Sequence, residues 1–239
     1  MRQVLVTGGG SGIGRAIAQS FAAQGDHVTI AGRRMDALEE TKGDTDMTCR
    51  TLDVSKEASV AALFDTPFDV VIANAGAGKS GKVADLSLAD WNNVINVNLT
   101  GVFLTFREAL RGMSSGGRLI AIASTASLQG GSNISAYSAS KHGVLGLVRS
   151  LAIEVAKSGV TCNAVCPGFV DTPMADAAVQ GVVDKFGVTP EKAAAMIVGG
   201  NPMKRMIDPA EVVAAVTFLA SAGASSINGH ALSVSGGEI

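Results

Sequence analysis

Tyr137 and Lys141 are the two residues whose types and spacing best suit proton transfer. They bound the segment Tyr137-Ser-Ala-Ser-Lys141, and a spacing of four places both side chains on one face of a helix. A free tyrosine has a pKa near ~10, which makes it a poor acid or base at neutral pH. A neighbouring ammonium stabilises the phenolate and lowers that pKa. We therefore predict an acid–base pair; the alternative is a surface tyrosine beside a solvated lysine.

The segment Thr7-Gly-Gly-Gly-Ser-Gly-Ile-Gly14 has the composition of a phosphate-binding turn. It follows a predicted strand and opens a predicted helix. Its glycines let the backbone approach a pyrophosphate, and the helix N-terminus supplies free N–H groups. The segment predicts a dinucleotide site with Gly8, Ser11, Gly12, Ile13 and Gly14 as cofactor-binding residues. The alternative is a strand-to-helix turn that needs glycine only for its own conformation.

The end of the second predicted strand bears on which dinucleotide is bound. NAD-binding proteins usually place an acid there to hold the ribose 2′-hydroxyl. Here the strand ends Ala31-Gly32-Arg33-Arg34, with two guanidiniums and no carboxylate. Guanidiniums bind a 2′-phosphate through charge-assisted, bidentate hydrogen bonds. Arg33 and Arg34 therefore favour NADP(H), with NAD(H) as the alternative; they could also be solvated surface charges.

Strands and helices alternate along the chain, which predicts the elements that position these residues. Predicted strands cover Val4–Thr7, Val28–Ala31, Thr48–Leu52, Asp69–Ala73, Arg118–Ala123, Val160–Val165 and Ala231–Val234. Predicted helices include Gly12–Gln24, Met35–Glu40, a helix containing Val60–Phe64, one long helix from Ser87 through Phe103, Ala136–Ala156, and one capped by Asp208. This alternation indicates an α/β fold: a single-domain (1–239), Rossmann-like, doubly wound parallel sheet of about seven strands with helices on both faces. The irregular region 172–205 is predicted to be a substrate lid.

Composition excludes several other classes of protein. The formal net charge is −2 and aromatic residues make up 4%, so we expect no nucleic-acid partner. The sequence contains no long, uncharged apolar run, so we expect no membrane span. The N-terminus resembles a strand more than a signal peptide. Three cysteines indicate a reducing compartment, hence the cytoplasm. Cys162 and Cys166 lack a nearby histidine and are expected in the core, so we expect no metal site.

Further motifs occur in a fixed order along the chain. Asn74-Ala-Gly76 follows the fourth predicted strand, Asn96-Val-Asn98 lies in the long helix, Ser124 follows the fifth strand, and Pro167-Gly168 follows the sixth. Together with the glycine-rich turn and the Tyr–Lys pair, these motifs resemble the short-chain dehydrogenase/reductase family over nearly the whole chain. The stretch from Asn163 to Met174 is most similar to ketoreductases of polyketide, fatty-acid and hydroxyacyl-thioester metabolism.

The resemblance implies a role for each matching residue. Tyr137 would be the general acid in reduction and the base in oxidation, and Lys141 would hold the nicotinamide ribose and lower the tyrosine pKa. Ser124, and with it Thr125, would bind the substrate oxygen, while Asn98 would anchor a water that passes protons to Lys141. The remaining implied cofactor contacts are Asp53 and Val54 at the adenine, Asn74 at the adenosine ribose, and Pro167, Gly168, Val170 and Thr172 at the nicotinamide. Ala75 and Gly76, which follow Asn74, are also predicted to bind the cofactor. Ser11 departs from the pattern, because NADP-dependent members often carry a basic residue there.

These observations predict an NADP(H)-dependent oxidoreductase that interconverts a ketone and a secondary alcohol, with 3-oxoacyl thioesters among its candidate substrates. The alternatives are an NAD-preferring alcohol dehydrogenase, a non-catalytic dinucleotide sensor, and an epimerase or dehydratase on the same fold. Apolar lid residues could line the substrate pocket or pack the lid onto the body: Phe169, Met174, Val179, Val182, Val183, Phe186, Met196 and Ile197. The resemblance also implies a homotetramer or homodimer built through the helices Trp91–Leu110 and Ala136–Ala156.

Overall fold

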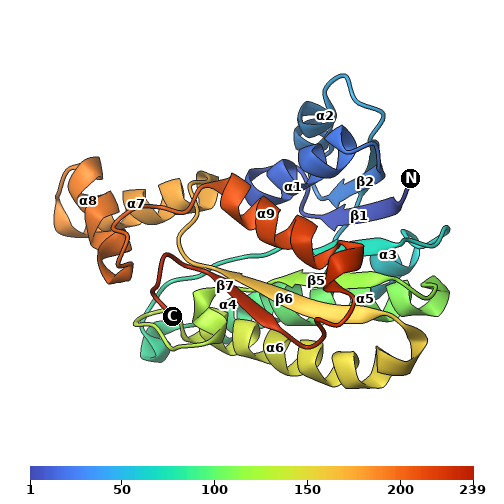
Figure 1. The fold of residues 1–239 in the computed structure, drawn as a ribbon. Helices are drawn as coiled ribbons and strands as arrows, with labels where there is room; N and C mark the ends of the chain where they lie inside the picture. The colour runs from blue at the N-terminus through green and yellow to red at the C-terminus, as the bar shows by residue number, and fades with distance from the viewer.

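The strands of the protein form a single parallel sheet in the computed structural model, which describes all 239 residues (Figure 1). The strand order is β3-β2-β1-β4-β5-β6-β7, and every neighbouring pair is parallel. The strands are β1 Gln3–Thr7, β2 His27–Gly32, β3 Thr48–Thr51, β4 Val70–Ala73, β5 Arg118–Ile122, β6 Thr161–Pro167 and β7 Ala231–Val234. The chain reverses its direction of winding between β1 and β4, and ligands bind at such a switch point. The predicted single-domain, doubly wound sheet is confirmed.

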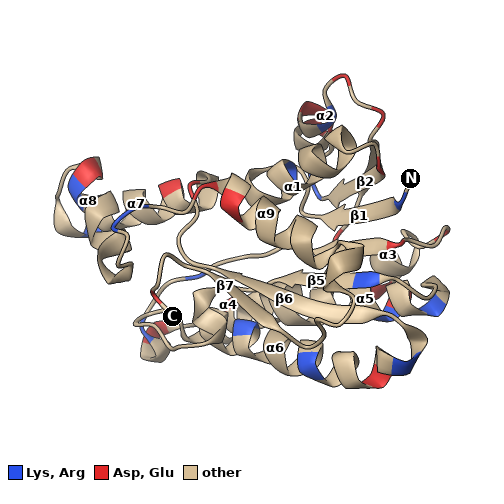
Figure 2. Ribbon diagram, in the orientation of Figure 1, with Lys and Arg blue, Asp and Glu red and all other residues tan.

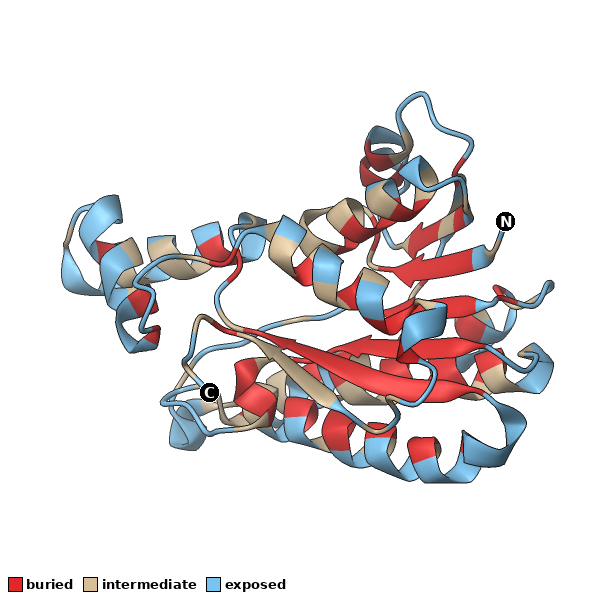
Figure 3. Ribbon diagram, viewed as in Figure 1, coloured by how far each residue is buried: buried red, intermediate tan, exposed pale blue.

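Two layers of helices cover the sheet (Figures 1 and 3). One face carries α1 (Gly12–Ala23), α2 (Met35–Lys42) and α9 (Pro209–Leu219), whose Ile17, Phe21 and Val216 are buried against it. The other face carries α3 (Glu57–Ala61), α4 (Leu88–Ile95), α5 (Gly101–Gly112) and α6 (Ser135–Val155), which contribute Phe106 and Val144 to a second core. Each fully buried side chain of this size stabilises the fold by about 1.5–3 kcal/mol. Cys162 and Cys166 are fully buried in this second core, as predicted.

Two predicted helices differ from the structure. The long helix after Ser87 is not continuous, because a π-helical turn at Asn96–Thr100 separates α4 from α5. A π turn inserts one extra residue into a helix and is frequently found at functional sites. The helix containing Val60 runs over Glu57–Ala61 and does not reach Phe64, which instead packs its ring edge-on against Phe68.

The helix starts read from the sequence are confirmed. Ser87 Oγ accepts a hydrogen bond of 3.0 Å from Asp90 N at the start of α4. Asp208 and Glu211 form a capping box around Pro209 at the start of α9. Each such cap stabilises its helix by about 1 kcal/mol.

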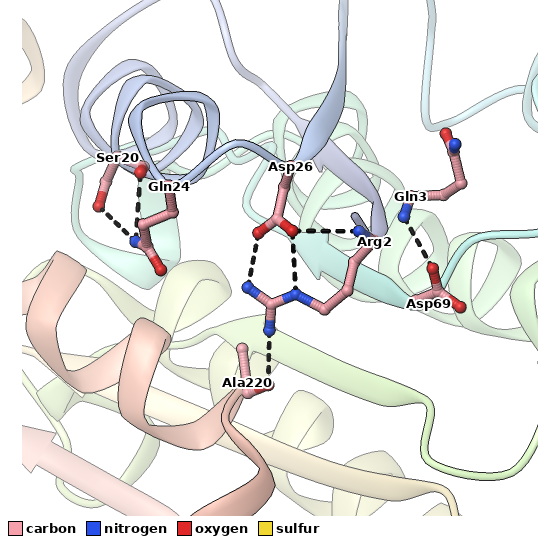
Figure 4. Close-up of polar contacts among 7 residues, drawn as sticks. All are labelled: Arg2, Gln3, Ser20, Gln24, Asp26, Asp69 and Ala220. Atoms are coloured by element: carbon pink, nitrogen blue, oxygen red, sulfur yellow. Dashed lines mark hydrogen bonds and ion pairs between the residues drawn. The ribbon is translucent and has the colours of Figure 1, made fainter.

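Arg2, just before β1, contacts two segments that are distant in sequence (Figure 4). These contacts lie at the amino ends of the strands. The Arg2 guanidinium donates to both carboxylate oxygens of Asp26 and, at 3.0 Å, to Ala220 O at the end of α9. Beside it, Gln3 N donates to Asp69 Oδ2 at 2.7 Å. These contacts hold β1 in place relative to α9 and β4.

The region 172–205 forms two helices, α7 (Pro173–Phe186) and α8 (Pro190–Ile197), which project beyond the carboxyl edge of the sheet (Figure 1). Their apolar residues are poorly covered: Met174 is 57% exposed and Phe186 55%. The predicted excursion above this edge is therefore present, and it leaves apolar surface open to a ligand or to further packing.

Charged residues of both signs are distributed over the helices and loops, without a large basic face (Figure 2). No helix is both long and apolar enough to cross a membrane.

Candidate active site

One cleft of about 760 Å³ follows the carboxyl edge of the sheet and contains nearly all of the predicted site residues. It begins at Arg33 and Arg34 after β2, passes the glycine-rich turn, and ends at Ser124, Tyr137 and Lys141. Its size lies within the range of sites for small molecules and cofactors. Of the predicted site residues, Asn98 alone does not line it.

The glycine-rich turn is closely packed against the loop that follows β4. Asn74 Nδ2 donates to Thr7 O at 3.0 Å and to Gly8 O at 3.1 Å, while Thr7 Oγ1 accepts from Asn74 N at 3.1 Å. A β-carbon on Gly14 would lie 2.2 Å from Gly8 O, and Gly8 itself has a φ of +69°. Only glycine fits these two positions. The backbone thus presents the N-terminus of α1 to the cleft, which is the arrangement that binds a phosphate.

Arg33 and Arg34 are exposed at the far end of the cleft, and neither forms a salt bridge. Nearby, Asp53 Oδ1 accepts hydrogen bonds from Ser55 N at 3.0 Å and Ser55 Oγ at 2.6 Å. The hydrogen bond from the Ser55 hydroxyl lowers the pKa of the Asp53 carboxyl, and this effect is larger than the opposing effect of partial burial. Arg33 lowers the pKa slightly further. Two free guanidiniums therefore remain available for an anionic group of a ligand.

Lys141 is buried on α6, with its ammonium held against the sheet. Its Nζ donates to Ile122 O at 2.7 Å and lies 5.7 Å from the centre of the Tyr137 ring. Burial lowers the pKa of Lys141 from its usual value to about 8. The spacing of four therefore brings the two side chains together, as the sequence predicts.

Tyr137 is half-buried and faces the cleft with Ser124. Burial raises the pKa of the tyrosine, and a hydrogen bond with the Ser124 side chain opposes this in part. The sequence led us to expect a pKa lowered by Lys141. The difference arises because the ammonium approaches the ring and donates to a backbone carbonyl, while desolvation of the phenol dominates.

Ser124 begins a short 3₁₀ turn, η3 (Thr125–Ser127), after β5. Its Oγ accepts from Ala126 N at 3.1 Å, and Ser127 Oγ accepts from Ser124 N at 3.2 Å. This reciprocal cap fixes the hydroxyl at the cleft wall. Thr125 is also buried at the wall.

Asn98 lies in the π turn and is fully buried. Its amide accepts from Ala77 N at 2.8 Å and donates to Ala77 O at 2.9 Å and Ser140 Oγ at 3.1 Å. Ser140 Oγ in turn donates to Tyr137 O at 2.7 Å. The Asn98 side chain thus joins the loop after β4 to the first turn of α6, which positions Tyr137.

The remaining predicted cofactor residues also lie along this cleft. Ile13, Val54, Ala75, Gly76, Pro167, Gly168, Val170 and Thr172 all line the cleft. Thr172 reaches across to the glycine-rich turn, because a β-carbon on Gly12 would lie 3.2 Å from Thr172 Cγ2. Of the eight apolar lid candidates, only Phe169 and Met174 line the cleft.

Three residues of the site were not predicted from the sequence. Ser140 orients the tyrosine turn, and its place between Tyr137 and Lys141 was the available signal. Gln129 and Glu238 line the cleft and are hydrogen-bonded at 2.8 Å, although they lie 109 residues apart. No local pattern in the sequence indicates such a contact.

Comparison with protein families finds one model, described as Enoyl-(Acyl carrier protein) reductase, that matches residues 8–238. A Streptomyces coelicolor protein named "Putative ketoacyl reductase" is 39% identical, covering 98% of this chain and 95% of the relative. The 3-oxoacyl-(acyl-carrier-protein) reductase MabA of Mycobacterium tuberculosis is 37% identical, covering 99% and 92%. The whole chain is therefore similar to reductases of this kind.

Solved structures give the same result. A variant of actinorhodin polyketide ketoreductase, crystallised with NADPH, superposes with a TM-score of 0.92 at 37% identity, covering 99% of this chain and 97% of the other. Levodione reductase superposes with a TM-score of 0.93 at 35% identity, with the same two coverages.

Proposed function

Because the chain belongs to the short-chain dehydrogenase/reductase family of oxidoreductases, we propose that it interconverts a ketone and a secondary alcohol using NADP(H). The observation that carries this proposal is the convergence of Ser124, Tyr137 and Lys141 in the cleft that also holds the glycine-rich turn. A dinucleotide-binding protein without chemistry would not need this constellation. The proposal can therefore be tested on single side chains.

The residues of the cleft fit a nicotinamide dinucleotide. The α1 N-terminus has no side-chain cap at Ser11, so its N–H groups are free to bind a pyrophosphate. Gly8 and Gly14 keep the turn free of side chains at the point of close approach. Lys141 and the Pro167–Thr172 segment would hold the nicotinamide end. When bound, this cofactor supplies or accepts the hydride.

Tyr137 moves the proton in our proposal. Burial raises its pKa, so the phenol is protonated at neutral pH and can donate from Oη to a carbonyl oxygen during reduction. Ser124 Oγ donates a hydrogen bond to the same oxygen and stabilises its developing charge. Lys141 is positioned to stabilise the phenolate left behind, because its ammonium is beside the ring. Oxidation uses the same groups in reverse.

Arg33 and Arg34 support a preference for NADP(H) over NAD(H). Both are exposed at the cleft end and free of carboxylate partners, so they can bind a 2′-phosphate. The solved relative crystallised with NADPH is consistent with this preference. Ser11 does not carry the basic side chain that would be a second indication of NADP(H) binding.

The substrate class that we propose is an apolar ketone, with 3-oxoacyl thioesters included. Two relatives are named for ketoacyl or oxoacyl substrates. Phe169 and Met174 give the catalytic end an apolar wall. The exposed apolar residues of α7 and α8 suit a lid over 172–205 that buries an acyl chain.

We further propose that the protein is cytoplasmic and assembles as a homotetramer or homodimer. The exposed apolar residues Phe103 on α5 and Ile153 on α6 support an interface through these helices.

The proposed function is tested with a panel of ketones and alcohols followed by NADPH and NADH absorbance. We expect reduction of at least one apolar ketone, and we expect Tyr137→Phe to lose about 10²–10⁴-fold in kcat while still binding NADPH. Ser138→Ala, a neighbouring α6 substitution, is the control and should retain activity. Normal turnover by Tyr137→Phe would overturn the mechanism, and tight NADPH binding without any turnover would favour a dinucleotide sensor.

A further inference from the structure

The C-terminal tail crosses the catalytic end of the cleft. After β7, Ser235 is buried, and its carbonyl accepts a hydrogen bond of 3.3 Å from Glu238 N. Gly168 N donates to Val234 O at 3.0 Å, which joins the tail to the loop after β6. A β-carbon on Gly236 would lie 2.4 Å from Asn201 Oδ1, so the tail also packs closely against the end of the lid. The tail therefore contacts the loop after β6 and the end of the 172–205 region.

The Glu238 carboxylate is the point at which this tail reaches the catalytic segment. Its Oε1 accepts a hydrogen bond of 2.8 Å from Gln129 Nε2, and Gln129 lies five residues after Ser124. Its Oε2 would lie 3.3 Å from a β-carbon on Gly168, in the segment predicted to line the nicotinamide. Glu238 thus lies between the substrate-binding serine segment and the loop after β6.

Few acidic side chains line the cleft. Asp53 and Glu238 are the two acidic residues that line the cleft, and Asp53 belongs to the Arg33 end. Glu238 forms no salt bridge, and the two lysines that line the cleft have other contacts: Lys141 donates to Ile122 O, and Lys79 pairs with Asp90 at 3.5 Å. The catalytic end therefore carries the Glu238 carboxylate, hydrogen-bonded to a neutral amide, together with the buried ammonium of Lys141.

We propose that Glu238 is a specificity-determining residue that selects neutral ketones over keto acids. A carboxylate on the substrate would face the Glu238 charge across the cleft, and like charges repel. An ester, thioester or cyclic ketone carries no such charge and meets no repulsion. This inference rests on the proposed ketone-reductase function and adds the charge class of the substrate.

The test compares ethyl acetoacetate with acetoacetate, which share a reacting ketone and differ in charge. The kcat/KM of each is measured with NADPH for the wild type, Glu238→Gln, Glu238→Ala and Glu154→Gln. We expect the wild type to prefer the ester, and both Glu238 variants to shift the ratio toward acetoacetate by about two- to tenfold. Glu154→Gln removes an exposed charge on α6 and should leave the ratio unchanged. Added salt should narrow the wild-type preference.

The two Glu238 variants separate charge from packing. Glutamine keeps an oxygen that can accept from Gln129 Nε2 but carries no charge, whereas alanine loses both. An unchanged ratio in Glu238→Gln overturns the proposal, and a shift in Glu238→Ala alone would show that the contact only holds the tail. If the wild type reduces neither ketone, the full panel of ketones and alcohols decides the proposed function. Calorimetric binding of benzoate and benzamide then decides the inference, because Glu238→Gln must tighten benzoate selectively.

Discussion

Lys141 Nζ lies 5.7 Å from the centre of the Tyr137 ring while donating a hydrogen bond of 2.7 Å to Ile122 O. A carbonyl of β5 thus fixes the position of the ammonium beside the phenol. Burial of the charged Lys141 side chain destabilises the folded state, because it lowers the lysine pKa from 10.5 to about 8. The unfolded chain therefore binds more protons than the folded one between these pH values. This destabilisation is fully present below about pH 8 and disappears as the pH rises toward 10.5.

Lys141→Met should therefore remove activity and stabilise the fold. We expect kcat/KM to fall by about 10²-fold or more, and the free energy of unfolding at pH 7 to rise by about 1–3 kcal/mol. Urea titrations at pH 7 and pH 10 measure this, and the gain should be smaller at pH 10. Lys157→Met, at an exposed position in the 3₁₀ turn Ala156–Ser158 that follows α6, is the control. A Lys141→Met protein that is less stable than the wild type at pH 7 would contradict the prediction.

The pH dependence of the two directions of reaction should differ. Burial raises the pKa of Tyr137, so the phenol stays protonated below its ordinary pKa of ~10. Reduction needs this protonated form, so its kcat/KM should change little between pH 6 and pH 8. Oxidation needs the phenolate, so its kcat/KM should rise with pH over the same range. Steady-state rates in both directions measure this; an oxidation rate that falls as the pH rises would refute the assignment of Tyr137 as base.

Much of the site was predictable because its positions are local consequences of the fold. Parallel strands end at one edge, so residues that follow β1, β4, β5 and β6 must gather there. The spacing between Tyr137 and Lys141 likewise fixes their common face on α6. For these residues, the position in the sequence pattern is enough to predict the position in the structure.

The remaining features depend on contacts between distant segments. The π turn at Asn96–Thr100 has the apolar pattern of an ordinary helix, and only the burial of Asn98 against Ala77 and Ser140 distinguishes it. The Gln129–Glu238 contact needs the tail to cross the cleft. The direction of the Tyr137 pKa depends on how much solvent the fold removes, which residue spacing does not specify.

Gly14→Ala should abolish cofactor binding. The new β-carbon would lie 2.2 Å from Gly8 O and 2.4 Å from Asn74 Nδ2, so the turn must move away from the loop after β4. We expect a loss of stability of about 1–3 kcal/mol, as in overpacked cores, and no measurable NADPH binding. Gly146→Ala, where nothing lies within 4 Å, should be stabilising by about 0.5–1 kcal/mol. Thermal unfolding and NADPH fluorescence give both values, and normal NADPH affinity in Gly14→Ala would exclude this turn as the phosphate site.

Replacement of Arg33 and Arg34 by serine should change the choice of cofactor. The double variant loses the two free guanidiniums at the cleft end, so the KM for NADPH should rise by about 10–100-fold while that for NADH changes little. Arg50→Ser, on β3 and paired with Asp65, removes a nearby charge outside the cleft and serves as the control. Equal effects on NADPH and NADH would show that these arginines are solvated surface charges.

Ile153→Glu should dissociate the proposed assembly. Ile153 is 82% exposed on α6 and lies beside a shallow hollow that also includes Ala152 and Asn228. A carboxylate buried there by a partner would lose its hydration, and Arg149, which also lines the hollow, is the single cation there that could offset this loss. Light scattering should show the wild type as a tetramer or dimer and Ile153→Glu as a smaller species. Phe186→Glu changes an exposed apolar residue of α7, outside the proposed interface, and should leave the assembly intact. A wild-type monomer at all concentrations would refute the interface.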